Sequence, residues 1–303
     1  MKERIFEATF EFMIENESRR QRPSLSGMLK YLGVSRSGYN AWLNRKPSKT
    51  EERRNEIKKH IQKEYDDSFQ NYGAPKITKI LRKQGYRIAE RTVGTYMSQM
   101  GIHAQWIKRW VYYPNSKSVN EEVRNLLKQK FNPRNPNAVW CTDITYIWTA
   151  NGFVYLTSVM DLYSRKIIAW TLSEDMKAES IVEAINKARK RRDISRTLII
   201  HSDRGSQYIS AEYKKATKKI NRSYSAKGYP YDNACIEAFH SLIKREWLKR
   251  YLIWDFQQAY QLCFEYIETF YNTKRIHSHC DYMSPNDFER IYFRSCSNIK
   301  LAM

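Results

Sequence analysis

The sequence has no long apolar run and few cysteines, and both absences narrow what the protein can be. No stretch approaches the roughly 20 apolar residues of a membrane-spanning helix, and the first residues, MKERIFEATFEF, lack the apolar centre of a signal peptide. The five cysteines are odd in number and scattered, with no CxxC pair, which argues against a disulfide framework. His277, His279 and Cys280 have no second Cys or His cluster with which to complete a structural zinc site. We therefore expect a soluble, intracellular protein.

Acidic residues are scarce relative to basic ones. The chain has 53 Lys and Arg against 32 Asp and Glu, a formal net charge of +21. Residues 1–132 hold 27 basic and 14 acidic side chains, and residues 133–303 hold 26 and 18, so the first part has the larger excess. Any single basic cluster, such as residues 187–192, is explained as well by a solvated helix face. A surplus over the whole chain favours a partner rich in phosphate.

Two stretches of the first 130 residues have the pattern of a helix-turn-helix. In residues 24–45, apolar residues at helical spacing precede Gly33, and Ser35 can cap a second helix that has an apolar face of its own. Residues 72–102 repeat the pattern around Gly85. Most helical pairs bind no DNA, so each is a weak signal alone. Two in series on the most basic part of the chain favour DNA binding.

Polar stretches separate these regions. Residues 46–57 and 112–122 lack periodicity and are interpreted as linkers, and a Pro- and Asn-rich stretch at 132–138 marks a boundary. Arg36 and Arg91, one in each helical region, are candidate DNA contacts. The sequence predicts four parts: a helix-turn-helix-like region at 1–50, a second such region with a linker at 51–130, an α/β core at 131–250 and a helical extension at 251–303.

Strand and helix signals alternate between residue 135 and about residue 250. β-Branched and aromatic residues predict strands at 139–148, 153–160 and 166–171, and Asn151-Gly152 is a strong hairpin turn signal. The later elements are expected as a helix at 179–192, a strand at 197–200, a short helix at 211–219, a strand at 222–225 and a helix at 234–249. This order is that of an RNase H-like α/β core.

Three carboxylates occupy unusual positions in this core. Asp143 lies midway along the first strand, where burial of an uncompensated charge is costly. Asp203 follows the fourth strand, which would lie beside the first. Glu237 lies near the start of the last helix, which Asp232 or Asn233 can cap. Singly, each acid could be a turn or cap residue. Together they fit phosphodiester cleavage with two Mg²⁺ ions, because such hard cations take oxygen ligands.

The last helix also carries a basic residue. Lys244 lies two helical turns after Glu237 on roughly the same face, where its ammonium could meet a DNA phosphate; a solvated surface lysine is the alternative. His240 could share this face or simply pack. The residues expected to shape the loop after the fourth strand, without chemistry of their own, are Arg204, Gln207 and Tyr208.

Four motifs make the sequence resemble the bacterial transposases of the insertion sequence three family, relatives of retroviral integrases. They are WCTDITYI (140–147), HSDRGSQY (201–208), YDNACIEAFHSLIKRE (231–246) and YNTKRIHS (271–278). The GVSRSGY and NYGAPKI stretches are similar to the helical region of the family. By this resemblance, Asp143, Asp203 and Glu237 would form a catalytic DDE triad that binds two Mg²⁺ or Mn²⁺ ions.

The resemblance implies a cytoplasmic, nucleoid-associated enzyme. It would cut the 3′ end of an insertion sequence and transfer the freed strand to DNA without a covalent enzyme intermediate. Its implied partners are double-stranded DNA of the element ends and the target, further copies of itself on that DNA, and the product of an upstream frame, fused or separate. Two alternatives stay open: an RNase H-like nuclease or resolvase, and a catalytically inactive DNA-binding regulator. No Arg-His-Arg-Tyr constellation of a tyrosine recombinase is evident.

Overall fold

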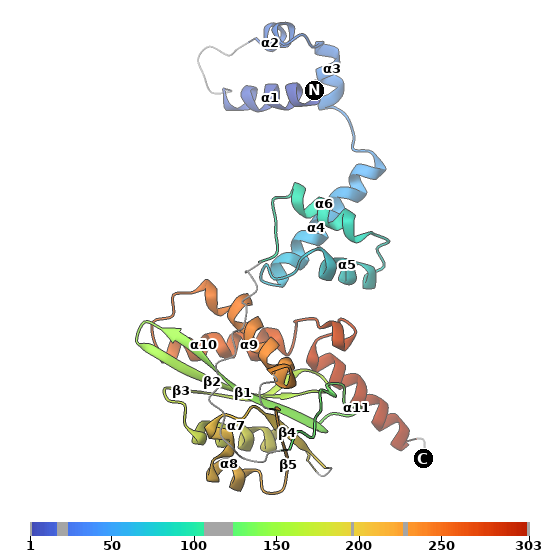
Figure 1. The fold of residues 1–303 in the computed structure, drawn as a ribbon. Helices are drawn as coiled ribbons and strands as arrows, with labels where there is room; N and C mark the ends of the chain where they lie inside the picture. The colour runs from blue at the N-terminus through green and yellow to red at the C-terminus, as the bar shows by residue number, and fades with distance from the viewer. Residues whose placement is uncertain (1, 17–23, 106–123, 195–196, 227–229, 302–303) are drawn as a thin grey trace. The chain divides into compact units, whose positions relative to one another are not determined.

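The computed structural model describes residues 2–16, 24–105, 124–194, 197–226 and 230–301 (Figure 1). The chain divides into two compact units, residues 1–61 and residues 62–303. The predicted linker at 112–122 lies outside the described residues. The helices of the first unit are α1 (Lys2–Glu15), α2 (Leu25–Tyr31), α3 (Arg36–Leu43) and the first part of α4 (Lys49–Asp67).

The predicted helix-turn-helix of the first unit is confirmed. Gly33 sits in the turn with a φ of +67°, a left-handed conformation that favours glycine. Ser35 caps α3, because its hydroxyl accepts a hydrogen bond from the Gly38 N–H over 3.1 Å. Phe6 of α1 meets Tyr39 of α3 edge to face, with ring centroids 5.8 Å apart. The apolar faces of the three helices thus form a small core.

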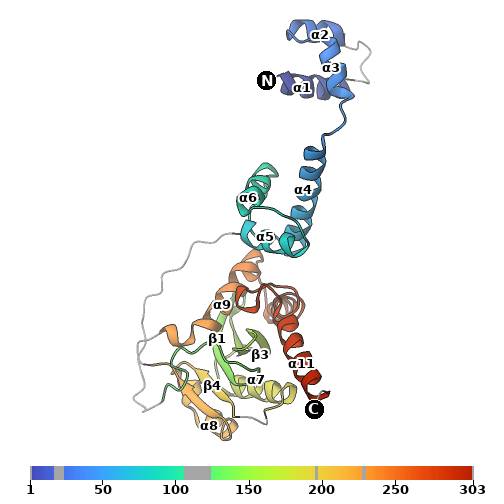
Figure 2. The same cartoon turned by 90° about the vertical axis from the view of Figure 1, so that its right-hand side faces the viewer.

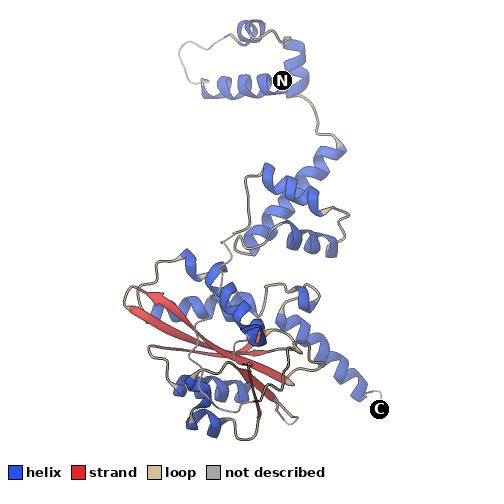
Figure 3. Cartoon of the chain, in the orientation of Figure 1, coloured by secondary structure: helices blue, strands red, loops and turns tan. Residues whose placement is uncertain are grey.

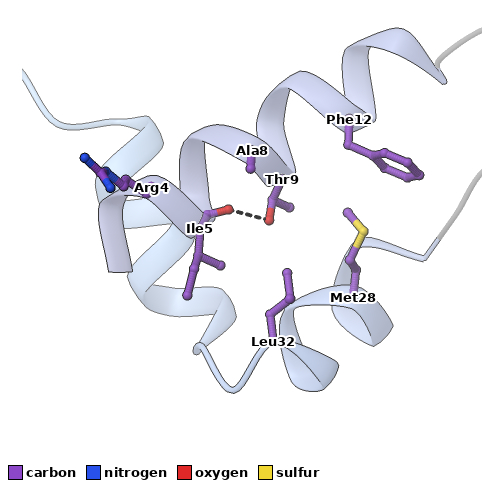
Figure 4. Close-up of a pocket in the computed structure, with 7 residues that line it drawn as sticks. All are labelled: Arg4, Ile5, Ala8, Thr9, Phe12, Met28 and Leu32. Atoms are coloured by element: carbon purple, nitrogen blue, oxygen red, sulfur yellow. Dashed lines mark hydrogen bonds between the residues drawn. The ribbon is translucent and has the colours of Figure 1, made fainter. Parts of the chain in front are cut away.

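A groove lies between α1 and α2 (Figure 4). Thr9 is buried there, and its hydroxyl donates to the Ile5 carbonyl oxygen over 2.7 Å, so its polar group is satisfied within α1. The residues that line the groove are Arg4, Ile5, Ala8, Thr9, Phe12, Met28 and Leu32. Its walls are therefore mostly apolar.

The predicted linker at 46–57 is wrong from residue 49 onward, where α4 begins. Ser48 and Glu51 form a capping box: the Glu51 N–H donates to the Ser48 hydroxyl over 3.3 Å, and the Ser48 N–H donates to the Glu51 carboxylate over 2.7 Å. The buried face of the helix starts only at Ile57 and continues with Ile61. Because the first two turns are polar, hydrophobic periodicity does not reveal them.

The second helical region is also confirmed, within the unit of residues 62–303. Its helices are the rest of α4, α5 (Ala74–Lys83) and α6 (Glu90–Gln99). Gly85 follows α5 with a φ of +94°. Ile77 of α5 and Val93 of α6 are fully buried, and the two helices pack against each other. Two helical pairs in series therefore precede the core.

The core has the predicted order of elements. Figure 3 shows its strands in red, with helices in blue around them. Its strands are β1 (Val139–Thr149), β2 (Gly152–Asp161), β3 (Lys166–Ser173), β4 (Ile199–Ser202) and β5 (Asn221–Tyr224), and its helices are α7 (Ala178–Arg191), α8 (Ala211–Ala216) and α9 (Ala234–Glu246). The sheet order is β3-β2-β1-β4-β5. The first three strands are antiparallel, and β4 and β5 run parallel to β1. This is the mixed sheet of an RNase H-like core.

Helices cover both faces of the sheet: α7 and α8 lie on one face, and α9 and α10 on the other (Figures 1 and 2). Trp140 of β1 and Ile185 of α7 are fully buried members of the larger core cluster, between the sheet and the first pair of helices. The C-terminal elements are α10 (Phe256–Phe264), a π-helical stretch (Glu265–Tyr271) and α11 (Pro285–Leu301). No helix in the described ranges is long and apolar enough to cross a membrane.

Candidate active site

The register of β1 and β4 brings two of the predicted acids together. These strands run parallel, with Cys141 opposite His201 as their last pair. Asp143 and Asp203 each lie two residues further on, so both leave the paired region at the same level and on the same side. The carboxyl ends of neighbouring parallel strands are where open α/β sheets place their ligands.

Glu237 and His240 approach Asp143 from α9. Glu237 lies in the first turn of the helix. One turn later, His240 places Nδ1 3.3 Å from Asp143 Oδ2 and Nε2 3.2 Å from the hydroxyl of Ser158. Ser158 of β2 is the cross-strand partner of Asp143. With hydrogen on Nδ1, His240 donates to the carboxylate and accepts from the serine, which fixes the orientation of Asp143.

The three carboxylates repel one another. Burial, and then the charge of Asp143, raises the pKa of Asp203 to about 6. Burial, and then the charges of Asp143 and Asp203, raises the pKa of Glu237 to about 7. Asp203 and Glu237 nevertheless keep an exposed side, while the Asp143 side chain is only 17% exposed. The site is therefore an accessible concentration of negative charge.

Lys244 is a basic residue in the last turn of α9. Its ammonium lies 4.2 Å from the ring centroid of Tyr146, an exposed residue of β1. Burial lowers the pKa of Lys244, and the negative charge of Asp143 acts in the opposite direction. The cation therefore lies within electrostatic reach of the acids.

A buried polar layer lies beneath the acids. The Tyr208 hydroxyl is 3.3 Å from Thr142 Oγ1, and burial together with the two aspartates raises the pKa of Tyr208 well above its usual value. Burial lowers the pKa of His201 to about 4, so this ring is neutral at physiological pH. Its two nitrogens lie 2.9 Å and 3.3 Å from the hydroxyls of Ser223 and Ser225. These groups support the strand ends.

The loop after β4 is tightly held. The Gly205 N–H donates to Asp203 Oδ1 over 2.9 Å, and a Cβ atom at Gly205 would lie only 3.1 Å from that oxygen. Arg204 donates from Nε to the Ser225 carbonyl oxygen over 2.7 Å, and Gln207 donates to the Met176 carbonyl oxygen over 3.2 Å. Arg204 and Gln207 thus shape the loop through backbone carbonyls.

The expected side-chain cap of α9 is wrong. Asn233 occupies the cap position, but its side chain makes no capping hydrogen bond. Asp232 points elsewhere and accepts hydrogen bonds from the Ala226 N–H over 2.7 Å and from Asn125 over 2.8 Å. Asp232 therefore connects the segment before the sheet to the loop that precedes α9. The position of Asp232 in the sequence does not predict this role.

The donor set suits a hard divalent cation. Carboxylate oxygens are the ligands that Mg²⁺ and Mn²⁺ prefer, and a bound cation would relieve the repulsion that raises the pKa values of Asp203 and Glu237. Across the described ranges, no three His, Cys, Asp or Glu side chains converge closely enough to hold one ion. The carboxylates are therefore neighbours with suitable chemistry rather than a closed ligand cage.

The far end of α9 carries a second carboxylate, which sequence reasoning missed. Glu246 is buried and receives hydrogen bonds from Arg275 Nε and Nη2, each over 2.7 Å, and from the Tyr266 hydroxyl over 2.8 Å. Against the effect of burial, Arg275 and then Lys76 and Tyr266 lower the pKa of Glu246. Arg275 belongs to the motif YNTKRIHS. The motif marks this segment, but it does not indicate that Arg275 pairs with Glu246.

The two other predicted DNA contacts lie on the helical pairs. Arg36 begins α3, and its Nη1 donates to the Ser26 hydroxyl over 3.1 Å. Arg91 lies in the first turn of α6 and is exposed. Both side chains remain predicted contacts.

Fold and site together define an RNase H-like integrase core preceded by helix-turn-helix-like regions. The family described as "Integrase core domain" matches residues 133–230, and a second family with the same description matches residues 218–285. The family described as "HTH-like domain" matches residues 52–110.

Curated relatives identify the family more narrowly. The chain is 37% identical over 250 residues to the transposase for insertion sequence element IS904 of Lactococcus lactis subsp. lactis, covering 82% of this chain and 99% of the relative. It is 37% identical over 275 residues to transposase InsF for insertion sequence IS3A of Escherichia coli K12, covering 88% and 94%. The chain therefore belongs to the insertion sequence three family of transposases, enzymes of DNA transposition and integration.

Solved structures with a similar arrangement include integrases. The simian T-cell lymphotropic virus intasome in complex with PP2A regulatory subunit B56 gamma gives a TM-score of 0.43 at 17% identity, covering 58% of this chain and 60% of the other. The catalytic core domain of BIV integrase gives 0.41 at 16% identity, covering 53% and 99%. The fold assignment itself rests on the sheet order and the family matches.

Proposed function

We propose that this chain is a DDE transposase that cuts the 3′ ends of an insertion sequence and joins them to target DNA with the aid of divalent metal ions. Asp143, Asp203 and Glu237 are the proposed catalytic and metal-binding residues. The observation that carries the proposal is that Asp143 and Asp203, at two neighbouring strand ends, and Glu237, on α9, lie near enough for their charges to interact. With burial, this repulsion raises the pKa values of Asp203 and Glu237.

The proposed reaction needs no covalent enzyme intermediate. In cleavage, a water oxygen bonds to phosphorus while the bond from phosphorus to the 3′ oxygen breaks; the departing oxygen takes a proton and becomes the free 3′-hydroxyl. In joining, that hydroxyl attacks a target phosphodiester, so one phosphodiester bond forms as another breaks. Two Mg²⁺ or Mn²⁺ ions, when bound, would activate the attacking oxygen and neutralise the leaving one.

The residues of this chain would hold the reacting groups in place. The three carboxylates would bind the ions, and His240 would keep Asp143 turned toward them through its contacts with Asp143 and Ser158. Lys244 would place a phosphate of double-stranded DNA beside the acids. Arg36 and Arg91 would hold DNA through the helix-turn-helix-like regions.

A strand-transfer assay on labelled oligonucleotides tests the catalytic roles. Asp143→Asn, Asp203→Asn and Glu237→Gln should each lower Mg²⁺-dependent joining by about a thousandfold or more, because each removes a metal ligand. Glu212→Gln neutralises an exposed acid on α8 and serves as the matched control with normal joining. Full joining by Asp203→Asn would refute the site. Cutting without joining would indicate a nuclease, and DNA binding without either would indicate a regulator.

Salt dependence of DNA binding tests the basic residues. Lys244→Ala, Arg36→Ala and Arg91→Ala should each reduce the slope of log affinity against log salt concentration by about one, the loss of one phosphate contact. Fluorescence anisotropy in EDTA gives the slopes without cleavage. An unchanged slope would remove that residue from the proposed DNA contacts.

A further inference from the structure

Three aromatic side chains lie exposed at the far end of the β1–β2 hairpin. Tyr146 is 53% exposed, Trp148 59% and Phe153 51%. The rings of Tyr146 and Phe153 meet edge to face, with centroids 5.5 Å apart. Single exposed aromatic residues are common, but three neighbours on one strand pair form a continuous apolar surface. We call these three residues the hairpin aromatic patch.

The register explains why the three rings share a face. Trp148 is the cross-strand partner of Phe153, and Tyr146 lies two residues before Trp148, so all three point to the same side of the hairpin. Ile147 and Val154 alternate with them and are buried on the other side. The patch therefore belongs to the sheet face that α7 covers further along the strands and leaves open here.

Lys244 connects the patch to the acids. Beyond Cys141, β1 has no pairing with β4 among the described residues, so no strand hydrogen-bonds to this edge of β1 between Asp143 and the hairpin tip. The Lys244 ammonium lies over the Tyr146 ring at this edge, within the field of Asp143. If a phosphate backbone runs from the acids past Lys244, the groups attached to it come close to the aromatic rings.

The flank of the patch is also apolar. The backbone N–H groups of Ala150 and Asn151 at the hairpin turn donate to the carbonyl oxygens of Ile253 and Trp254, over 2.8 Å and 3.2 Å. Trp254 is 60% exposed, and Leu252 of the same segment 58%. The hairpin tip thus offers flat apolar surface beside one cation, the combination that binds the bases and the backbone of single-stranded nucleic acid.

Unpaired bases are the occupant that these features favour. In duplex DNA, each base face is covered by the next base pair, so a protein ring can stack without kinking the duplex only on a terminal or unpaired base. The proposed function, on which this inference rests, produces strand ends at the acids. We propose that the hairpin aromatic patch is a stacking subsite for unpaired bases of the DNA strand next to the cleaved bond, with Lys244 holding the intervening phosphate.

Binding of a short fluorescein-labelled oligothymidine to the full chain in EDTA tests this subsite. Trp148→Ala and Phe153→Ala should each weaken binding about tenfold, and Trp148→Phe should keep it, because aromatic stacking tolerates the exchange. An abasic oligonucleotide with the same phosphates separates stacking from charge: on it, the alanine variants should bind as the wild type does. Equal losses on both oligonucleotides, or no loss on either, would overturn the proposal.

Phe293→Ala is the matched control. Phe293 of α11 is 47% exposed, and its ring lies 5.5 Å from that of Tyr292, much as Phe153 lies against Tyr146. This variant should bind oligothymidine normally. Sedimentation equilibrium without DNA tests whether a second copy of the chain occupies the patch instead. If Trp148→Ala dissociates an oligomer, the patch joins copies of the chain and the proposal is wrong. Metal-dependent cutting by the wild type, measured in parallel, shows separately whether the proposed function holds.

Discussion

The two ends of α9 carry the same side chain in opposite electrostatic settings. At the first turn, burial and then the charges of two aspartates raise the pKa of Glu237 to about 7. At the last turn, buried Glu246 is held by Arg275 and Tyr266, and its pKa is lowered. One helix thus joins an unsatisfied carboxylate, ready for a ligand, to a satisfied one that anchors the helix. The contacts of Glu246 anchor the last turn of α9. They therefore help to keep Glu237, in the first turn, beside the two aspartates that repel it.

Arg275→Met would remove the cation that pairs with Glu246 at the last turn of α9. It would leave Glu246 buried without a cation, which should lower the free energy of unfolding by about 3–5 kcal/mol. Urea denaturation of the full chain, followed by near-ultraviolet circular dichroism, measures the change. The double variant Glu246→Met with Arg275→Met should recover most of the loss, since it leaves no charge unpaired. A loss below about 1 kcal/mol in the single variant would show that the pair does not anchor α9.

Lys76→Met would sharpen the comparison, because Lys76 is a second cation near the ion pair of Glu246 and Arg275. Burial, and then repulsion from Arg275, lowers the pKa of Lys76 to about 7. Glu246 attracts the ammonium and Arg245 repels it, while the Tyr72 ring lies 4.6 Å from Nζ. Replacement by methionine should therefore raise the free energy of unfolding by about 1–3 kcal/mol near neutral pH.

The sign of the pH dependence follows from the lowered pKa of Lys76. Below about pH 7 the lysine is charged in both states, so the folded state carries the whole penalty; as the pH rises toward 10.5, the folded lysine loses its proton and the penalty disappears. The advantage of Lys76→Met in urea denaturation should shrink over that range. An advantage that grew with pH would contradict the proposed burial of the charge.

Glu237→Gln tests the first turn of α9 and should change the free energy of unfolding least of the three substitutions. Removing one of three repelling carboxylates should raise the free energy of unfolding by about 0.5–1 kcal/mol in EDTA, a figure reduced for the exposure of Glu237. Its pKa is raised from 4.5 to about 7, so the gain should be complete above pH 7 and vanish below pH 4.5, where both states are protonated. A net loss of stability above pH 7 would mean that Glu237 is paired in the folded protein.

Much of the core follows from the sequence because its signals are local. Strand patterns and the Asn151-Gly152 turn predict the β1–β2 hairpin, and Asp143 and Asp203 end up side by side because parallel pairing extends their strands in register. The position of the turn also fixes the hairpin register, in which Ser158 is the partner of Asp143. The strand patterns alone do not give this pairing. Local periodicity was enough for these elements.

Other features depend on contacts between distant segments. Hydrophobic periodicity missed the first turns of α4, where Ser48 and Glu51 cap a polar stretch. No local pattern pairs Glu246 with Arg275, because the partners come from different elements and meet only in the folded core. The same holds for the stacking of Lys244 on Tyr146. Side-chain partners, unlike elements, are set by tertiary packing.

The hydrogen bonds from Arg275 to Glu246 bear on how this protein should be trimmed. A fragment of residues 131–250 contains all three acids but not Arg275. Helix α9 would then end in a buried anion without a counter-ion, and we expect such a fragment to aggregate or to lose the orientation of Glu237. Expression boundaries drawn just after α9 would omit the residue that anchors this helix, so the smallest useful core extends past residue 275.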